Sequence, residues 1–119
     1  MSDASVRATS TVAGKAAGII AGLGLSQDEV GAIVDASGRS IARWISGAAS
    51  PQRLSKQRLL ELAYVAEALA EVLPRERANT WILSPNRLLD HESPAHRIHD
   101  GRYREVLGLI DGLAEGVIV

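Results

Sequence analysis

The stretch that decides the fold is residues 25–47, LSQDEVGAIVDASGRSIARWISG. Ser26 and Glu29 have the S-x-x-E spacing of a capping box, in which each side chain pairs with an unbonded backbone N–H at a helix start. Ser37 can cap a second helix, and Gly47 stands where a glycine would end it. Six apolar side chains recur at helical spacing and are expected to be buried: Val30, Ile33, Val34, Ile41, Trp44 and Ile45. Together these features predict a helix-turn-helix.

The second helix of this motif leaves Arg39, Ser40 and Arg43 exposed, at the spacing that faces a DNA major groove. The motif resembles the Xre-type helix-turn-helix of bacterial repressors and antitoxins. In that family the glutamine that opens the first helix contacts a phosphate, and early residues of the second helix face base edges. The resemblance implies six DNA-binding residues: Gln27, Ser37, Gly38, Arg39, Ser40 and Arg43. The alternative is that these residues only cap and solubilise two packed helices.

The formal charge of the 119-residue chain is −1, but it is unevenly distributed. Residues 1–60 have a net charge of +3, and residues 61–119 have a net charge of −4. Residues 36–60 contain five cations and no acid. The positive field is therefore local to the second helix and the turn after it, which adds Arg53 and Lys56 to the candidate DNA contacts. So small a patch predicts weak DNA binding by a monomer, and we expect a homodimer or a larger assembly.

Composition favours an all-α protein, because Ala, Leu, Arg and Glu are abundant and three consecutive β-branched residues occur only at 117–119. The absence of cysteine excludes disulfides and thiolate metal or redox chemistry, and it fits a cytoplasmic protein. Residues 1–10 lack the apolar core of a signal peptide, and we expect them to form a disordered tail. The longest apolar stretch, residues 16–25, is too short to span a bilayer. We divide the rest into a helix-turn-helix region, residues 11–54, and a helical domain, residues 55–119.

Hydrophobic periodicity predicts two long helices around the motif. The first, residues 11–23, has Gly14, Gly18 and Gly22 along one side, a pattern expected where another backbone comes close or where a helix is frayed. The second, residues 55–73, is the strongest in the chain and is apolar on most sides. We expect this central helix to contact its own core on one side and another subunit on the other.

Shorter segments follow Pro74, starting with a predicted helix over residues 75–83. Ser84-Pro85 and Ser93-Pro94 each place an N-cap serine before a proline at the first helical position. Leu88 and Leu89 are expected to be buried after the first of these starts. The last predicted helix, residues 102–115, has glycine at every fourth position, which indicates close contact with a partner backbone; these glycines are Gly108, Gly112 and Gly116.

The second half of the chain resembles the toxin-binding domain shared by Xre/MbcA/ParS antitoxins. The features that match are, in order, Trp81, Pro85-Asn86, Leu89, Pro94, Gly101, Val106 and Gly116. Such antitoxins are paired with a RES-domain toxin that resembles ADP-ribosyltransferases and destroys NAD. The resemblance implies an antitoxin that neutralises this toxin and represses its own promoter. It assigns toxin binding to Trp81, Asn86, Arg87, Gly112, Gly116, Val117, Ile118 and Val119, the last four blocking the active-site cleft.

Without the resemblance, the residues alone predict a helical DNA-binding regulator that oligomerises and has no toxin partner. A third hypothesis is an interaction module whose helix-turn-helix no longer binds DNA. One departure from the Xre pattern matters here. A full Xre domain has two further helices behind the reading helix, whereas here one long helix leads directly into the second half.

The sequence contains few candidates for catalytic residues or metal ligands. Histidines and acids cluster within ten residues, at His91, Glu92, His96, His99 and Asp100. Pro94 separates His91 from the other histidines, and the H-E-x-x-H spacing of a zinc site is missing. Solvated surface histidines explain the cluster more simply. We therefore expect no catalytic activity, no metal and no cofactor.

Overall fold

The structure, a computed structural model, describes residues 11–116. This part of the chain contains seven α-helices and one 3-10 helix, and no strand. The elements are α2 (Val12–Leu23), α3 (Gln27–Val34), α4 (Gly38–Ser46), α5 (Arg53–Ala70), α6 (Arg75–Leu83), η1 (Arg87–Leu89), α7 (Pro94–His99) and α8 (Tyr103–Ala114). The predicted all-α class is confirmed, and the predicted disordered tail at residues 1–10 lies outside the described residues.

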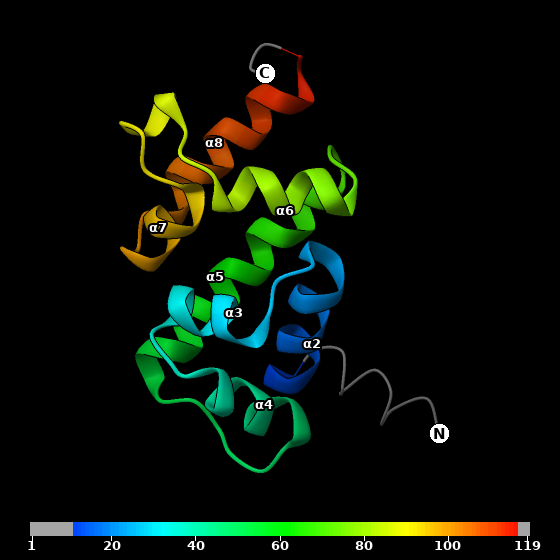
Figure 1. Cartoon of the computed structure of the whole chain (residues 1–119), viewed down its shortest axis with the longest axis vertical. Helices are drawn as coiled ribbons and strands as arrows, with labels where there is room; N and C mark the ends of the chain where they lie inside the picture. The colour runs from blue at the N-terminus through cyan, green and yellow to red at the C-terminus, as the bar shows by residue number, and fades with distance from the viewer. Residues whose placement is uncertain (1–10, 117–119) are drawn as a thin grey trace.

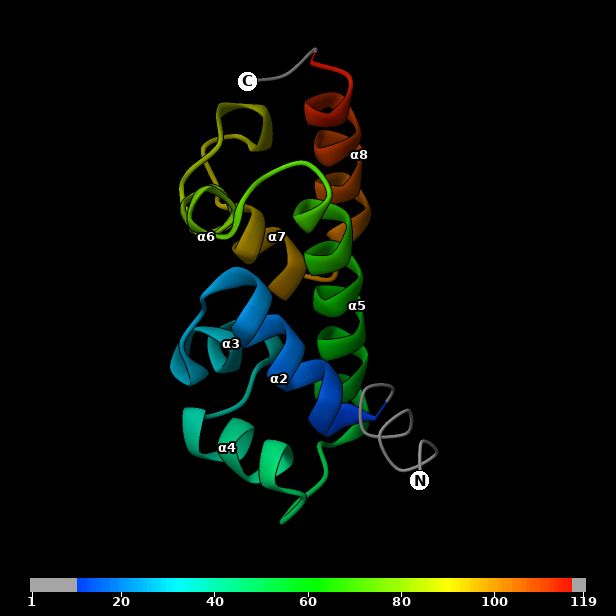
Figure 2. The same ribbon diagram turned by 90° about the vertical axis from the view of Figure 1, so that its right-hand side faces the viewer.

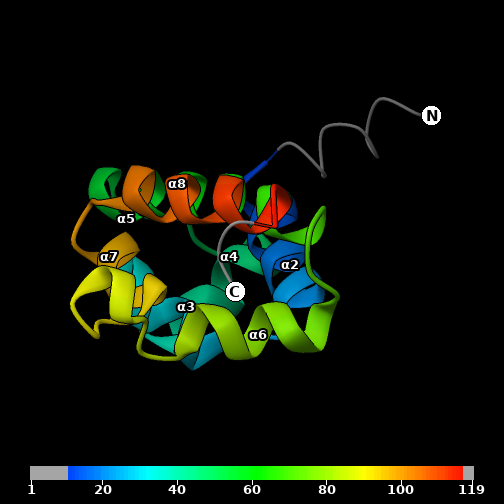
Figure 3. The ribbon, with the colours of Figure 1, turned by 90° about the horizontal axis from the view of Figure 1, so that it is seen from above.

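The helices form two layers. Figure 2 shows α5 and α8 along one side of the molecule and the remaining helices on the other, and the view from above in Figure 3 agrees. The molecule measures 43 × 29 × 21 Å, with α4 at one end of the long axis and α8 reaching the other (Figure 1). One cluster of buried side chains continues through both halves. The predicted division at residue 54 falls in the first turn of α5 and stays a prediction.

The helix-turn-helix forms through the caps that the sequence predicts. The Glu29 N–H donates to Ser26 Oγ over 3.0 Å, and the Ser26 N–H donates to Glu29 Oε1 over 2.8 Å, which completes the capping box at α3. Ser37 Oγ accepts from the Ser40 N–H over 3.0 Å at the start of α4. Gly47 ends α4 at φ +81°, in the left-handed region that favours glycine. Local chemistry therefore sets both ends of α4.

The tightest point of the motif is Gly31, inside α3. A Cβ at this position would overlap the Ala36 carbonyl oxygen, because the turn between α3 and α4 folds back over it. The Ala36 N–H donates to the Gly31 carbonyl over 2.9 Å across the same contact. Gly31 is therefore needed for close approach of backbone, a requirement that the apolar pattern of α3 did not reveal.

Helix α5 is central, as predicted, and contacts α2, α3, α6, α7 and α8. Its inward face is fully buried at Leu59, Leu62, Val65 and Leu69. Its outward face is not: Leu60 is 41% exposed and Tyr64 is 61% exposed within the described chain. Helix α5 was expected to be buried on most sides, but within the described chain only its inward face is buried. The contact of its outward face with a second subunit stays a prediction.

The segment after α6 differs from its prediction. Ser84 ends α6 in an extended conformation and does not cap a new helix, and the residue before a proline disfavours helical backbone. Asn86 caps η1 in its place, where Asn86 Oδ1 accepts from the Leu88 N–H over 2.9 Å. Leu89 is buried, but Leu88 is 50% exposed, so its predicted burial is wrong. Ser93-Pro94 does start α7 as predicted.

Three glycines of the two stripes do not contact another segment of the described chain. A Cβ at Gly18, Gly22 or Gly108 would meet no atom within 4 Å. Helix α2 is nevertheless regular, with Thr11 Oγ1 accepting from the Gly14 N–H at its start. At these three glycines, the contact with another backbone that the stripes predict is therefore not made within residues 11–116.

Among the described residues, no single helix has the length and apolar composition to cross a membrane. The bent pair α2 and α3, at 117° to each other, meets those two criteria only when taken together.

Candidate functional site

The first candidate surface is the exposed face of α4. Ile41 and Trp44 are buried and fix α4 against the core, which leaves Arg39 and Arg43 exposed one turn apart. Gln27, at the start of α3, is also exposed, and Ser40 is half-buried with its hydroxyl paired to Ser37. The arrangement presents two guanidinium groups that can donate to base edges or phosphates.

Gly38, for which the resemblance implies a DNA contact, lies at the junction of α3 and α4. It is buried, and a Cβ there would overlap the Asp28 carboxylate of α3. Gly38 therefore permits close approach between α3 and α4, and its predicted contact with DNA stays a prediction. The same contact brings the Asp28 carboxylate to the start of α4. The fold thus places an acid beside the patch that the sequence leaves free of acids.

The first turn of α5 continues the cationic surface with Arg53 and Lys56, which are both exposed. Arg58, the third cation of this helix, instead makes contacts within the fold. Its Nε donates to the His99 carbonyl over 3.1 Å, and its Nη1 lies 3.1 Å from Glu61 Oε1. Arg58 therefore ties α5 to the end of α7 and does not belong to the DNA-facing group.

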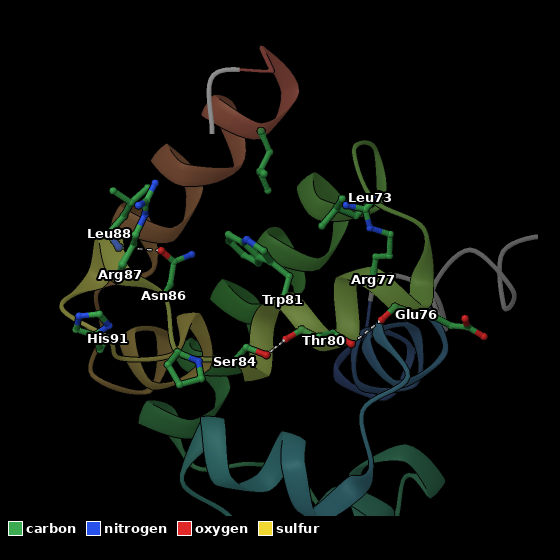
Figure 4. Close-up of a pocket in the computed structure, with 12 residues that line it drawn as sticks. Leu73, Glu76, Arg77, Thr80, Trp81, Ser84, Asn86, Arg87, Leu88 and His91 are labelled. Carbon is green, nitrogen blue, oxygen red and sulfur yellow. Dashed lines mark hydrogen bonds between the residues drawn. The ribbon is translucent and has the colours of Figure 1, made fainter. Parts of the chain in front are cut away.

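The second candidate surface is a groove of about 950 Å³ at the other end of the molecule. It lies between α6, the segment of residues 84–91 and the end of α8 (Figure 4). Three of the predicted toxin contacts, Trp81, Asn86 and Arg87, line it together. We call it the α6 groove, and define it by its twelve lining residues: Leu73, Glu76, Arg77, Thr80, Trp81, Ser84, Pro85, Asn86, Arg87, Leu88, His91 and Leu113.

Trp81 has a buried indole nitrogen with no hydrogen-bond partner among the described residues. A buried donor without a partner costs free energy, so an acceptor from outside residues 11–116 would stabilise it. Sequence reasoning found Trp81 but missed the apolar residues around it, Leu73, Leu88 and Leu113. Leu113 comes from a helix remote in sequence, and only the tertiary fold places it here.

The remaining predicted toxin contacts belong to α8 and beyond. Gly112 is half-buried in the last turn of α8, and it does not line the groove. Gly116 is exposed at φ +72°, just after the helix. Val117, Ile118 and Val119 lie outside the described residues.

Arg97 is the structural centre of the C-terminal lobe, where η1, α7 and α8 meet, and no sequence pattern singled it out. It is only 5% exposed, and its guanidinium forms ion pairs with Glu92 and Glu105 and donates to the Leu89 carbonyl over 2.8 Å. The hydrogen bond to Glu92 raises the pKa of Arg97 above its ordinary value. The hydrogen bond from Arg102 lowers the pKa of Glu105. These contacts hold η1, α7 and α8 together beside the α6 groove.

The histidine and acid cluster is divided by the fold. His91 lines the α6 groove, whereas His96 lies on α7 with its Nε2 3.3 Å from both Glu92 Oε2 and Asp100 Oδ2. Ligand atoms of these last three residues lie within 4.8 Å of one another. Their side chains are partly exposed and make the surface contacts that solvated polar groups commonly make, and the expectation of no metal stays a prediction.

Comparison with known proteins identifies the family. No protein-family model matches the chain. The chain is 62% identical over 108 residues to the mycobacterial cidal antitoxin MbcA of Mycobacterium bovis and, equally, of Mycobacterium tuberculosis, covering 91% of this chain and 96% of each relative. The chain belongs to the MbcA family of mycobacterial cidal antitoxins. A probable mycobacterial cidal antitoxin of M. tuberculosis is 28% identical over 96 residues, covering 81% of this chain and 82% of that protein.

The fold of this MbcA-family chain also matches a solved structure. A chain in the crystal structure of the M. tuberculosis MbcT–MbcA toxin–antitoxin complex superposes with a TM-score of 0.83 at 61% identity, covering 92% of this chain and 98% of that one. The predicted resemblance is thus confirmed. The MbcA-family chain has two candidate surfaces, the cationic face of α4 and the α6 groove, at opposite ends of the molecule.

Proposed function

We propose that this chain neutralises a RES-domain toxin that degrades NAD, by binding it through the C-terminal lobe. The observation that supports the proposal most directly is the similarity to a chain of the MbcT–MbcA toxin–antitoxin complex. The antitoxin acts by binding and is not an enzyme. It works in the cytoplasm, where NAD and promoter DNA are both found.

The α6 groove has the chemistry of a protein-binding surface. Trp81 and Arg87 line it, and tryptophan and arginine are the residue types that most often dominate binding energy at interfaces. The half-exposed Leu88 adds apolar area that a partner would bury. In this proposal the groove and Gly112 contact the body of the toxin, and residues 116–119 block its active site.

The helix-turn-helix binds the promoter of the chain's own operon in the same proposal. Arg39 and Arg43 face the major groove, while Arg53 and Lys56 contact phosphates. Gln27 and Ser37, at the starts of α3 and α4, also contact the DNA. Because the patch is small and the acid of Asp28 lies beside it, a homodimer or a larger complex with the toxin is needed for tight binding.

The first test is co-expression with the neighbouring open reading frame, following growth and total NAD. We expect the neighbour alone to stop growth and deplete NAD, and this chain to reverse both and co-purify with it. A neighbour that depletes NAD but is not bound by this chain would contradict the proposal.

A DNA-binding regulator without a toxin partner is the second candidate. The exposed pair Arg39 and Arg43 is the observation that favours it. A harmless neighbour, together with a specific promoter shift in a gel, would support the regulator and exclude the antitoxin function.

A further inference from the structure

We propose that the α6 groove binds a segment of the toxin in which an apolar side chain lies between two acidic ones. The inference rests on the proposed function and deepens it, because it names the chemistry that the groove recognises in its partner. It follows from cationic and hydrogen-bonding groups of the groove that have no partner within residues 11–116.

The arginines of the second half differ in whether they have a partner. Residues 61–119 contain six arginines and no lysine. Four of them have a hydrogen bond, an ion pair or a ring contact within the described chain, namely Arg75, Arg97, Arg102 and Arg104. The side chains of the other two, Arg77 and Arg87, have no such partner among residues 11–116, and both line the α6 groove.

The two unpaired arginines lie on opposite sides of an apolar centre. Figure 4 shows Trp81 between Arg77 and Arg87, while the side chain of Glu76 points away from Trp81. Both arginines are exposed and open to a partner. The groove therefore presents a cation, an apolar surface and a second cation in that order.

The lining also has more hydrogen-bond donors than acceptors. Trp81 Nε1 is buried and has no partner among the described residues. Asn86 Oδ1 already accepts from the Leu88 N–H, which leaves the Asn86 amide N–H groups as donors without a partner in the described chain. Guanidinium and indole groups donate and do not accept. A partner must therefore bring acceptors, and next to two guanidinium groups the strongest acceptors are ionised carboxylates.

The identity of the partner class follows from the chemistry and from the matched complex. The similar chain of known structure belongs to a toxin–antitoxin complex, so the partner considered is a protein. Aspartate and glutamate are the protein side chains that pair with a guanidinium through two parallel hydrogen bonds. An apolar side chain placed on Trp81 and Leu113 would exclude water between the two pairs and strengthen both.

The charge of the surrounding lobe makes such recognition selective. Residues 61–119 have a net charge of −4, so the lobe as a whole repels an acidic surface. The two unpaired arginines are a local exception within it. A toxin segment whose acids meet these arginines is attracted, whereas the same acids in another register face repulsion, and this difference fixes how the partner docks.

The test is competition for the product of the neighbouring open reading frame. A fluorescently labelled full-length chain is bound to that protein, and unlabelled variants displace it while anisotropy is followed. Arg77→Glu and Arg87→Glu should each compete about tenfold less well than the unchanged chain, and the difference should narrow as salt is raised. The matched control Arg104→Glu, at an exposed arginine of α8 outside the groove, should compete as the unchanged chain does.

A charge exchange identifies the acidic partner. Each aspartate and glutamate of the neighbouring protein is replaced singly by arginine and tested against Arg87→Glu. At least one replacement should restore binding to Arg87→Glu while weakening binding to the unchanged chain. The proposal is overturned if no replacement restores binding, or if both arginine variants compete fully. Thermal unfolding shows which variants fold, and Arg87→Gln takes the place of Arg87→Glu if the reversed charge destabilises the chain.

The outcomes separate this proposal from the proposed function. If the unchanged chain does not bind the neighbouring protein at all, both proposals fail together. If it binds and only Leu88→Asp, not the arginine variants, weakens binding, the groove takes an apolar segment and the acidic partner alone is excluded. If the arginine variants keep toxin binding but lose affinity for promoter DNA, the groove binds nucleic acid and the acidic partner is again excluded.

Discussion

At the scale of single residues, the glycines separate into those that the fold requires and those that it leaves free. Gly31 and Gly38 lie where backbone and side chain of neighbouring segments come too close for a Cβ, and both are in the helix-turn-helix. Gly18, in the middle of α2, has open space around it. The same residue type thus has opposite effects on stability at positions that the sequence alone does not distinguish.

This difference gives a matched pair of substitutions. Gly31→Ala should lower the free energy of unfolding by about 1–3 kcal/mol, because the new methyl group forces the turn at Ala36 away from α3. Gly18→Ala should raise it by about 0.5–1 kcal/mol, because alanine restricts the unfolded chain and favours helix. Urea unfolding followed by circular dichroism measures both. A stabilised Gly31→Ala variant would contradict the close approach.

Glu105 makes part of the stability dependent on pH. Its pKa is lowered, first by the hydrogen bond from Arg102 and also by Arg97, so the folded state favours the ionised form. This contribution is fully present above the ordinary pKa of glutamate and is lost as the pH falls through the lowered value. Glu105→Gln should therefore show a smaller loss of unfolding free energy between pH 7 and about pH 3 than the unchanged chain.

Denaturant unfolding at a series of pH values measures this difference. The matched control is Glu115→Gln, at the exposed end of α8. A Glu105→Gln variant with the same pH dependence as the unchanged chain would show that the ion pairs of Glu105 with Arg102 and Arg97 do not contribute in this range.

At the scale of elements, the buried face of α4 positions the helix, and its exposed face is available for contact with DNA. Ile41 and Trp44 lock it against the core, while Arg39 and Arg43 point away from it. A further exposed cation, Arg53, lies on a different helix, in the first turn of α5. Base contacts and phosphate contacts are therefore expected from different elements.

The three arginines should respond differently when DNA binding is measured. Arg39→Ala and Arg43→Ala should each cost about 1–3 kcal/mol in promoter binding and relax the sequence preference. Arg53→Ala should weaken binding to all sequences alike and reduce the slope of affinity against salt by about one. Fluorescence anisotropy over a salt series measures both effects.

Arg104→Ala is the matched control, because Arg104 is exposed on α8 in the opposite half of the chain. If Arg39→Ala and Arg43→Ala bind the promoter as the unchanged chain does, α4 is not the reading helix. The surface would then only solubilise the motif.

At the scale of the whole molecule, α5 joins two ends with different chemistry. Helix α4 lies at one end of the molecule, and the end of α8 lies at the other (Figure 1). The α4 end presents cations, and the opposite end presents the α6 groove. Arg58 on α5 ties the two halves through the His99 carbonyl. The separation predicts that changes at one end leave binding at the other end intact.

Deletion of Ile118 and Val119 tests this separation. We expect the shortened chain to lose inhibition of the co-expressed toxin, so that NAD falls and growth stops, because the blocking segment is gone. Its affinity for promoter DNA should be unchanged. Total NAD and anisotropy measure the two properties on the same variant, and full inhibition by the shortened chain would show that another surface covers the toxin active site.

The sequence by itself determined most of the helices and several of their ends, although the start predicted at Ser84-Pro85 did not form. The capping box at Ser26 and Glu29, the cap at Ser37, the stop at Gly47 and the start at Ser93-Pro94 all form as predicted, because each depends on side chains within four residues of the backbone they bond. The apolar stripe of α5 likewise predicts its buried face. Resemblance to the antitoxin family added a function that the residues alone did not contain.

Only the tertiary structure decided which segments remote in sequence contact one another. It buried Gly38 against Asp28, left Leu88 exposed, made Arg97 the centre of the C-terminal lobe and brought Leu113 beside Trp81. These outcomes depend on contacts between segments remote in sequence, which no local spacing encodes. Helix ends follow from short-range hydrogen bonds, whereas the groove follows from how the helices pack, and the physical reason for the difference is the range of the interaction.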